Sequence, residues 1–254
     1  MAATLSADRG AWLKDARAAS WRAFQEAPAP APTVETWRRL PAAAWELDRL
    51  TESDAPVLGA VSPAATAAAL RLGLELTPLE DAAARYPELL NGPLGTPAVG
   101  ADFRRLEAAN QALWRGGAFL RIPAGVSVAE PVHVVFRHEG SREFAFPRLF
   151  VLAEEGSSAT VIEEHLGAED AAGAAVKSAA FSTVRVAQGA RLRLFYTQEL
   201  DARAVHFWHQ RVELARDACL EHCSIMLGGS RLKSELEVAL QGAGANSEIR
   251  GILL

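Results

Sequence analysis

The sequence has few cysteines, no long apolar run and no excess of positive charge, and each shortage excludes a class of protein. Only two of its 254 residues are cysteine, too few for a disulfide framework, which agrees with a reducing compartment. No apolar run approaches the roughly 18 residues that a membrane-spanning helix needs. The N-terminus alternates charged and apolar residues, unlike a signal peptide. We therefore expect a cytoplasmic protein.

Positive charge is not gathered in either half of the chain. Residues 1–115 carry 12 basic and 14 acidic side chains, and residues 116–254 carry 14 and 17. This balance predicts no face for nucleic acid or for a membrane surface. Half of the residues are hydrophobic and 22% are charged, as in an ordinary globular protein that can bury a core.

Motifs of catalysis are also missing. The glycine-rich pieces at residues 228–230 and 242–245 lack the Gly-Lys-Ser/Thr that follows in a phosphate-binding loop, and we interpret them as turns. No Gly-x-Ser-x-Gly elbow, His-Glu-x-x-His helix or paired-cysteine zinc spacing occurs. The sequence motifs therefore give no support to an enzyme.

The sequence contains one pattern that recurs: an apolar strand, a glycine or aspartate, a small residue and a second strand with alternating apolar and polar residues. The turn residues are Gly125, Gly156, Gly189, Asp217 and Gly244, so the steps between them are 31, 33, 28 and 27 residues. Glycine and aspartate tolerate the backbone conformation of a tight turn. Repeats of strands at such steps predict a solenoid or a sandwich, in which the copies pile on one another to bury their apolar faces.

Alternation within a copy predicts which side chains face that core. Leu192 and Leu194 are expected inside, whereas Arg191 and Arg193 face water. The longest step, from Gly156 to Gly189, is explained by an Ala/Gly/acidic loop at residues 166–175 that bulges from one coil.

The first 115 residues favour helices. Residues 7–26 have the spacing of an amphipathic helix, and the alternating prolines of residues 27–32 end it and form an extended spacer. Further helices are predicted over residues 63–70, after a start at Ser62, and over residues 102–114.

One more helix is expected to begin at Thr77, with Thr77 as its cap and Pro78 in its first turn. After Gly116-Gly117 the hydrophobic period changes from about 3.6 to 2 residues. We therefore predict two domains, a helical domain at residues 1–115 and a β domain at residues 116–254.

Several segments, in this order and spacing, resemble the SufB/SufD family, and SufD in particular. They are Trp37-Arg38, residues 103–112, the glycine pair before residues 119–126, Glu130-Pro131-Val132-His133-Val134, Phe146-Pro147-Arg148-Leu149, Glu163-Glu164 and residues 240–252. The resemblance implies a small helical N-terminal domain followed by a right-handed parallel β-helix. It covers the whole chain, but family members continue through further coils and C-terminal helices, so we expect a β-helix truncated at its C-terminal end.

The resemblance also implies a function without catalysis. A SufD-like chain is a non-catalytic scaffold subunit of SUF iron–sulfur cluster assembly, pairing with SufB and working with the SufC ATPase. It would bind no cofactor by itself, and the complex would assemble the cluster. The alternatives are a β-helix enzyme acting on carbohydrate or an acyl donor, and a self-associating structural module that forms a homodimer.

Two cysteines are weak candidates for a metal site. On a strand, Cys219, Glu221 and Cys223 would share one face, with Leu220 and His222 on the other. Two thiolates and a carboxylate can bind a soft metal. However, a strand separates such neighbours by about 6.6 to 7 Å, which is long for one ion, so we favour structural cysteines.

The histidines form no evident set. His206 and His209 would lie on opposite faces of a strand, and we interpret them as residues at the edge of the core. His133, His138 and His165 lie in or beside early strands without an evident partner.

Overall fold

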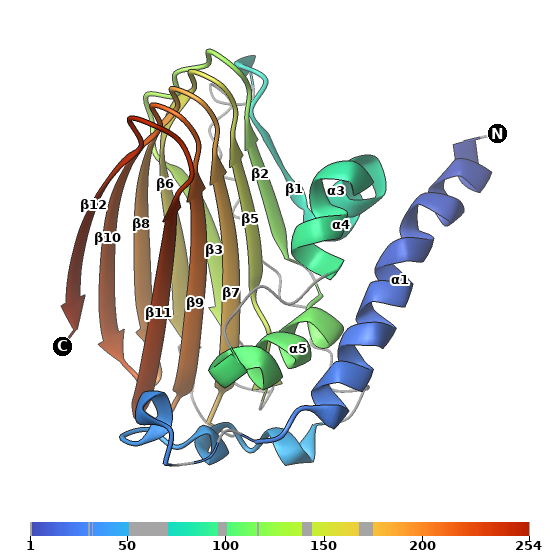
Figure 1. The fold of residues 1–254 in the computed structure, drawn as a ribbon, viewed down its shortest axis with the longest axis vertical. Coiled ribbons are helices and arrows are strands. Elements are labelled where there is room, and N and C mark those ends of the chain that lie inside the picture. Colours follow the sequence, from blue (N-terminus) through green and yellow to red (C-terminus); the bar gives the residue numbers. More distant parts are fainter. Residues whose placement is uncertain are drawn as a thin grey trace.

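The computed structural model describes residues 2–29, 31, 33–50, 71–95, 101–115, 117–138, 144–167 and 175–253. Its dominant feature is a parallel β-solenoid, with helices against one side (Figure 1). The solenoid confirms the predicted fold class. The predicted helix over residues 63–70 lies outside the described residues. No helix in the described part of the chain is long and apolar enough to cross a membrane.

The strands form two sheets. Sheet A has the order β1-β2-β5-β7-β9-β11, with β4 beside β7, and sheet B has the order β12-β10-β8-β6-β3. All pairs are parallel except β1 with β2. The strand bounds in sheet A are β1 (Glu75–Pro78), β2 (Ala118–Ile122), β4 (Phe144–Ala145), β5 (Arg148–Ala153), β7 (Lys177–Val186), β9 (Val205–Leu214) and β11 (Arg231–Leu240). Those in sheet B are β3 (Val132–His138), β6 (Ser158–Gly167), β8 (Arg191–Leu200), β10 (Cys219–Gly228) and β12 (Asn246–Leu253).

The five predicted turn residues all adopt the left-handed backbone conformation. Gly125, Gly156, Gly189 and Gly244 have φ between 64° and 74°, and Asp217 has φ 56°. Most L-residues rarely adopt this region because the Cβ atom clashes with the backbone, which explains why glycine or aspartate occurs at each turn.

The repeat steps are the registers between neighbouring coils. Ser127 pairs with Ser158, which reproduces the step from Gly125 to Gly156. In sheet B the same row continues from Ser158 to Arg191 and then to Cys219 and Asn246. These register shifts equal the remaining steps between the turn residues, so the repeat predicted the strand pairing as well as the fold class.

The two sheets differ in their outer faces. Sheet B alternates buried and exposed residues, and Leu192 and Leu194 lie inside with Arg191 and Arg193 outside, as predicted. In sheet A the outer face is apolar too, because Phe119, Phe150, Phe181 and Phe207 point away from the solenoid interior.

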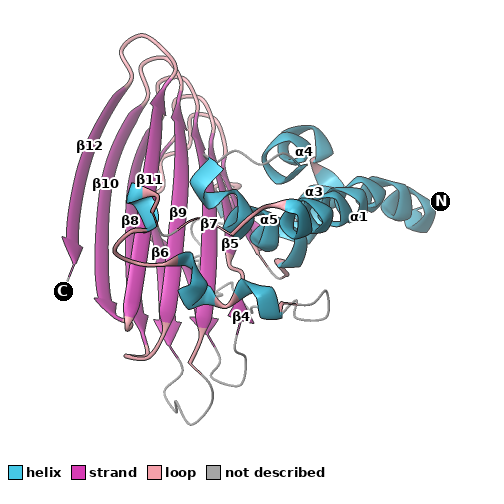
Figure 2. Cartoon of the chain, turned by 60° about the horizontal axis from the view of Figure 1, so that its bottom comes forward, coloured by secondary structure: helices cyan, strands magenta, loops and turns pink. Residues whose placement is uncertain are grey.

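The helices cover this aromatic face of sheet A. They are α1 (Ala2–Glu26), α3 (Leu79–Arg85), α4 (Pro87–Gly95) and α5 (Arg104–Leu113), and all lie on one side in Figure 2. Short 3-10 helices, η1 (Glu35–Trp37), η2 (Ala42–Trp45) and η3 (Leu47–Arg49), cross the end of the same face, and η5 (Ala101–Phe103) precedes α5. Helix α1 ends directly before the proline spacer, as predicted.

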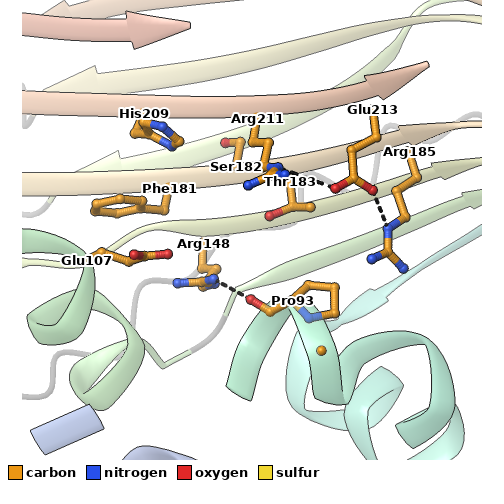
Figure 3. A pocket seen from close by; sticks show the side chains of 11 residues that line it. Pro93, Glu107, Arg148, Phe181, Ser182, Thr183, Arg185, His209, Arg211 and Glu213 are labelled. Atoms are coloured by element: carbon orange, nitrogen blue, oxygen red, sulfur yellow. Dashed lines mark hydrogen bonds and ion pairs between the residues drawn. The ribbon is translucent and has the colours of Figure 1, made fainter. Parts of the chain in front are cut away.

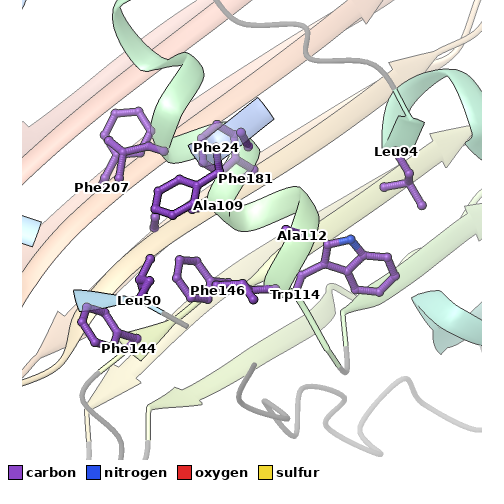
Figure 4. Close-up of a cluster of buried hydrophobic side chains, with 14 of the residues drawn as sticks. Phe24, Leu50, Leu94, Ala109, Ala112, Trp114, Phe144, Phe146, Phe181 and Phe207 are labelled. Carbon is purple, nitrogen blue, oxygen red and sulfur yellow. The ribbon is translucent and has the colours of Figure 1, made fainter. Parts of the chain in front are cut away.

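The core therefore has two layers. The first packs the helices on sheet A and includes Phe24, Trp114, Phe146, Phe181 and Phe207 (Figure 4). The second lies between the two sheets, where valines, leucines and alanines of successive coils meet. Buried hydrogen bonds join helix to sheet in the first layer: Asn110 Nδ2 donates to the carbonyls of Pro147 (2.9 Å) and Ala179 (2.7 Å).

The expected cap at Thr77 is wrong. Residues 75–78 form β1 instead, antiparallel to β2, and α3 begins at Leu79 with Pro78 at its N-cap position and no side-chain cap. Thr77 Oγ1 accepts a hydrogen bond from Arg85 (3.0 Å). The short strand is favoured because it pairs with the first strand of the solenoid, which outweighs the local capping pattern. The division of the chain into two domains stays a prediction, although α5 and β2 flank the predicted boundary.

Candidate functional site

The two cysteines lie on the outer face of sheet B. Strand β10 turns Cys219, Glu221 and Cys223 outward and buries Leu220 and His222, which confirms the predicted alternation. Both thiols are free and half-buried. In the described part of the chain no three His, Cys, Asp or Glu side chains are placed to hold one metal ion. A structural role for the cysteines stays a prediction.

The predicted placement of His206 and His209 on opposite faces of β9 is confirmed. Both are buried, however, at 1% and 5% exposure, rather than at the edge of the core. His206 points between the sheets, and His209 lies on the helix side, with its ring 5.5 Å from that of Phe181. His133 is half-buried on the outer face of sheet B.

His138 and His165, for which the sequence showed no evident partner, lie together in the structure. His138 Nε2 lies 3.1 Å from His165 Nδ1, and His165 Nε2 lies 3.1 Å from Glu163 Oε1. The sequence pattern did not reveal this chain, because His138 and His165 belong to different coils and meet only through the coil register. Both histidines and the carboxylate are at most 2% exposed.

Glu163 is the centre of this buried cluster. Its carboxylate also accepts hydrogen bonds from Ser182 Oγ, at 2.7 and 2.9 Å, and from Gln210 Nε2, at 3.1 Å. Glu163 lies on β6 of sheet B, whereas Ser182 and Gln210 lie on β7 and β9 of sheet A. One carboxylate thus connects the two sheets and neighbouring coils.

A second pair lies beside it. Tyr196 Oη is 2.6 Å from His206 Nε2, and the His206 ring is 5.4 Å from that of His165. Burial, with Glu163 as a second cause, raises the pKa of Tyr196 well above its usual range. The phenol therefore keeps its proton and donates a hydrogen bond to His206 Nε2. Burial lowers the pKa of His206 well below its usual range, with the neighbouring His165 and His138 adding to the effect.

Hydrogen bonds join the two imidazoles to the carboxylate. His165 Nε2 donates to the Glu163 carboxylate, and the other His165 ring nitrogen, Nδ1, shares a hydrogen bond with His138 Nε2. Burial, and then repulsion from His165, lowers the pKa of His138 well below its usual range, which keeps that ring neutral. The cluster is therefore a chain of two imidazoles that ends on one carboxylate.

The stacked register builds the cluster. Glu163 lies beside Tyr196, and His165 beside Gln198, on adjacent coils of sheet B. Ser182 lies beside Gln210 on the facing sheet. Near the tight turns the same interior is apolar, so each coil has an apolar half and a polar half. We call the polar half the polar interior; its members are His138, Glu163, His165, Ser178, Ser182, Tyr196, Gln198, His206, Trp208, Gln210 and His222.

Several atoms of the polar interior have no hydrogen-bond partner among the described residues. They are His138 Nδ1, Ser178 Oγ, Gln198 Oε1 and Nε2, His206 Nδ1, Trp208 Nε1, Gln210 Oε1 and both ring nitrogens of His222. An unsatisfied buried polar group costs about 1 to 3 kcal/mol, and internal water is its usual partner in a polar interior. This half of the coil is thus suited to hold ordered water, whereas the apolar half is not.

The chemistry open to this arrangement is limited. It contains no thiol, and its side chains are closed from solvent, so no large substrate reaches them. Hydrogen bonds of this kind favour the register in which each buried polar group meets a matching neighbour.

A scan against protein families matches residues 136–254 to the model of the SUF system FeS cluster assembly, SufBD core domain. This region runs from within β3 to the end of the described chain, and it contains most of both sheets.

Three relatives illustrate the likeness. The iron–sulfur cluster assembly protein SufD of Bacillus subtilis is 33% identical over 94 residues, which is 37% of this chain and 22% of that protein. An iron–sulfur cluster assembly SufBD family protein of Mycobacterium tuberculosis is 26% identical over 159 residues, 63% of this chain and 38% of the relative. One of Staphylococcus saprophyticus is 30% identical over 83 residues, 33% of this chain and 18% of the relative. The chain thus spans less than two fifths of the length of each of these proteins.

Proposed function

Because the chain belongs to the SufB/SufD family, whose named relatives are iron–sulfur cluster assembly proteins, we propose that it acts as a non-catalytic, SufD-like scaffold subunit of the SUF system. In this role it pairs with a SufB-like subunit and works with a SufC-like ATPase in the cytoplasm. The iron–sulfur cluster is the product that the complex assembles, and this chain contributes surface rather than a cofactor of its own.

The observation that carries the proposal is the agreement between the matched region and the stacked coils. Residues 136–254 are the part that matches the SufBD core, and they form the parallel solenoid from β3 to β12. Solenoids present extended surfaces that suit protein partners. A scaffold needs such a surface.

The enzyme alternative has less support, since the histidine and carboxylate cluster is closed to solvent and the sequence has no catalytic motif.

Co-expression with the SufB-like and SufC-like proteins of the same organism tests the proposal. We expect the tagged chain to retain both partners through size-exclusion chromatography. Retention of neither partner, together with cleavage of a polysaccharide or transfer of an acyl group by the isolated chain, would support the enzyme instead. A homodimer that excludes the SufB-like protein would support the self-associating module.

A further inference from the structure

A pocket of about 190 Å³ lies between α4, α5 and the outer face of sheet A. It is on the opposite side of sheet A from the polar interior. Arginines from three neighbouring strands line it: Arg148 of β5, Arg185 of β7 and Arg211 of β9, together with Thr183 and His209 (Figure 3).

Arg148 is the unusual member of this pocket. Its side chain is buried, at 3% exposure, and its guanidinium donates to Asn110 Oδ1 (2.9 Å) and to the carbonyl of Pro93 (3.0 Å). Neither acceptor is charged, and Arg148 forms no ion pair within the described residues. Burial lowers its pKa to about 10, with Glu107 opposing the shift, so Arg148 is still a cation at pH 7. A buried cation is costly unless an anion accompanies it.

The other two arginines share one carboxylate. Glu213 lies between them, 3.1 Å from Arg185 Nε and 3.3 Å from Arg211 Nε (Figure 3). Arg211 Nη1 also lies 3.7 Å from Glu237 Oε1, which is not part of the pocket lining. The pocket lining thus has three guanidinium groups and two carboxylates, those of Glu107 and Glu213. The balance of charge in the lining is positive.

The pKa of His209 responds to the same positive charges. Its pKa is lowered to about 4, first by burial and then by the charges of Arg148 and Arg211. The imidazole is therefore neutral at pH 7 and does not add to the charge, but it can still donate or accept a hydrogen bond. Thr183 adds a hydroxyl to the lining.

We infer that this pocket binds a small oxyanion, anchored by Arg148 and flanked by Arg211 and Arg185. Guanidinium groups bind phosphate and carboxylate oxygens in pairs, which a lysine does not. The volume is below the roughly 300 to 1,000 Å³ of pockets for drug-sized ligands. The ligand is therefore of the size of inorganic phosphate or a short carboxylate, and a nucleotide does not fit.

Titration calorimetry with inorganic phosphate, with chloride balancing the ionic strength, tests this inference. We expect saturable binding to the wild-type chain, and Arg148→Gln to weaken it about 10- to 100-fold, since hydrogen bonds to charged groups have that worth. Arg148→Lys should recover only part of the affinity, because it restores the charge without the planar fork. Citrate in place of phosphate shows which oxyanion the pocket prefers.

Arg193→Gln is the matched control. Arg193 pairs with Glu221 at 3.1 Å, like Arg185 with Glu213, but on the outer face of sheet B. We expect it to bind phosphate like the wild type. Should Arg148→Gln fail to fold, Arg211→Gln, at a partly exposed position, replaces it with the same expected weakening.

Three results would overturn the inference. The first is no saturable binding of phosphate or citrate at constant ionic strength. The second is unchanged affinity in the folded Arg148→Gln or Arg211→Gln variant. The third is an equal loss in Arg193→Gln, which would mean that the anion responds only to overall charge.

Discussion

Glu163→Gln tests whether the buried cluster holds the coils in register. The carboxylate accepts hydrogen bonds from Ser182, Gln210 and His165. Glutamine has the same shape as glutamate, but its amide nitrogen is itself a hydrogen-bond donor. It would face one or two of these donors, and those hydrogen bonds would be lost. A hydrogen bond to a charged group contributes about 1.5 to 3 kcal/mol, so we expect a loss of about 2 to 5 kcal/mol in the free energy of unfolding. Typical domains have only about 5 to 15 kcal/mol in total.

Urea denaturation followed by circular dichroism measures this loss. We expect a lower midpoint with an unchanged slope, because the native and unfolded surfaces stay similar. Glu164→Gln is the control: Glu164 is the next residue on β6, half-buried on the opposite face. A change within about 0.5 kcal/mol is expected there. If Glu163→Gln also stays within that limit, the cluster does not determine the register.

Three further predictions concern single features. Gly156→Ala should cost about 1 kcal/mol, because φ is 64° there, whereas Gly92→Ala in α4 should gain up to about 1 kcal/mol. Neither added methyl group meets an atom within 4 Å, so the two variants differ only in backbone conformation. Changes of the same sign in the two melting temperatures would contradict this argument. Burial is the main cause that lowers the pKa of His222 to about 4. Between pH 6.5 and 4, His222 therefore binds a proton in the unfolded chain but not in the folded chain. Stability should therefore decrease as the pH falls through this window, by about 2 kcal/mol at pH 5 from this group, and His222→Leu should reduce that slope; an unchanged slope would exclude this group. The double variant Cys219→Ala, Cys223→Ala should retain as much iron in the purified complex as the wild type, and a loss would make the thiols ligands.

The solenoid could be predicted well from the sequence because its signals are local. A glycine or aspartate is needed wherever the backbone turns left-handed, and the distance between such residues equals the register of the next coil. The step from Gly189 to Asp217, for example, equals the shift with which Arg191 of β8 pairs with Cys219 of β10.

The helix cover could also have been predicted. Strands β7 and β9 have apolar residues on both faces, which is typical of strands that are covered on both sides. Strand β8 alternates and has one side in water. Phe181 and Phe207 on the outer face thus indicate the side that the helices pack against. By contrast, β1 could not be predicted, because Thr77-Pro78 has a strong helix-start pattern and only the pairing with β2 overrides it.

The polar interior could have been predicted only in part. Advancing along the chain by the step between Gly156 and Gly189 leads from Glu163 to Tyr196, so the rows of sheet B follow from the repeat. The partners on sheet A do not follow, because the repeat fixes which residues stack along the solenoid but not which residues face each other across it. Ser182 and Gln210 reach Glu163 across the coil, and that distance depends on the packed width of the interior. Reading the repeat as a register would therefore have located the acid and its neighbours in one sheet, while their hydrogen bonds to the other sheet required the structure.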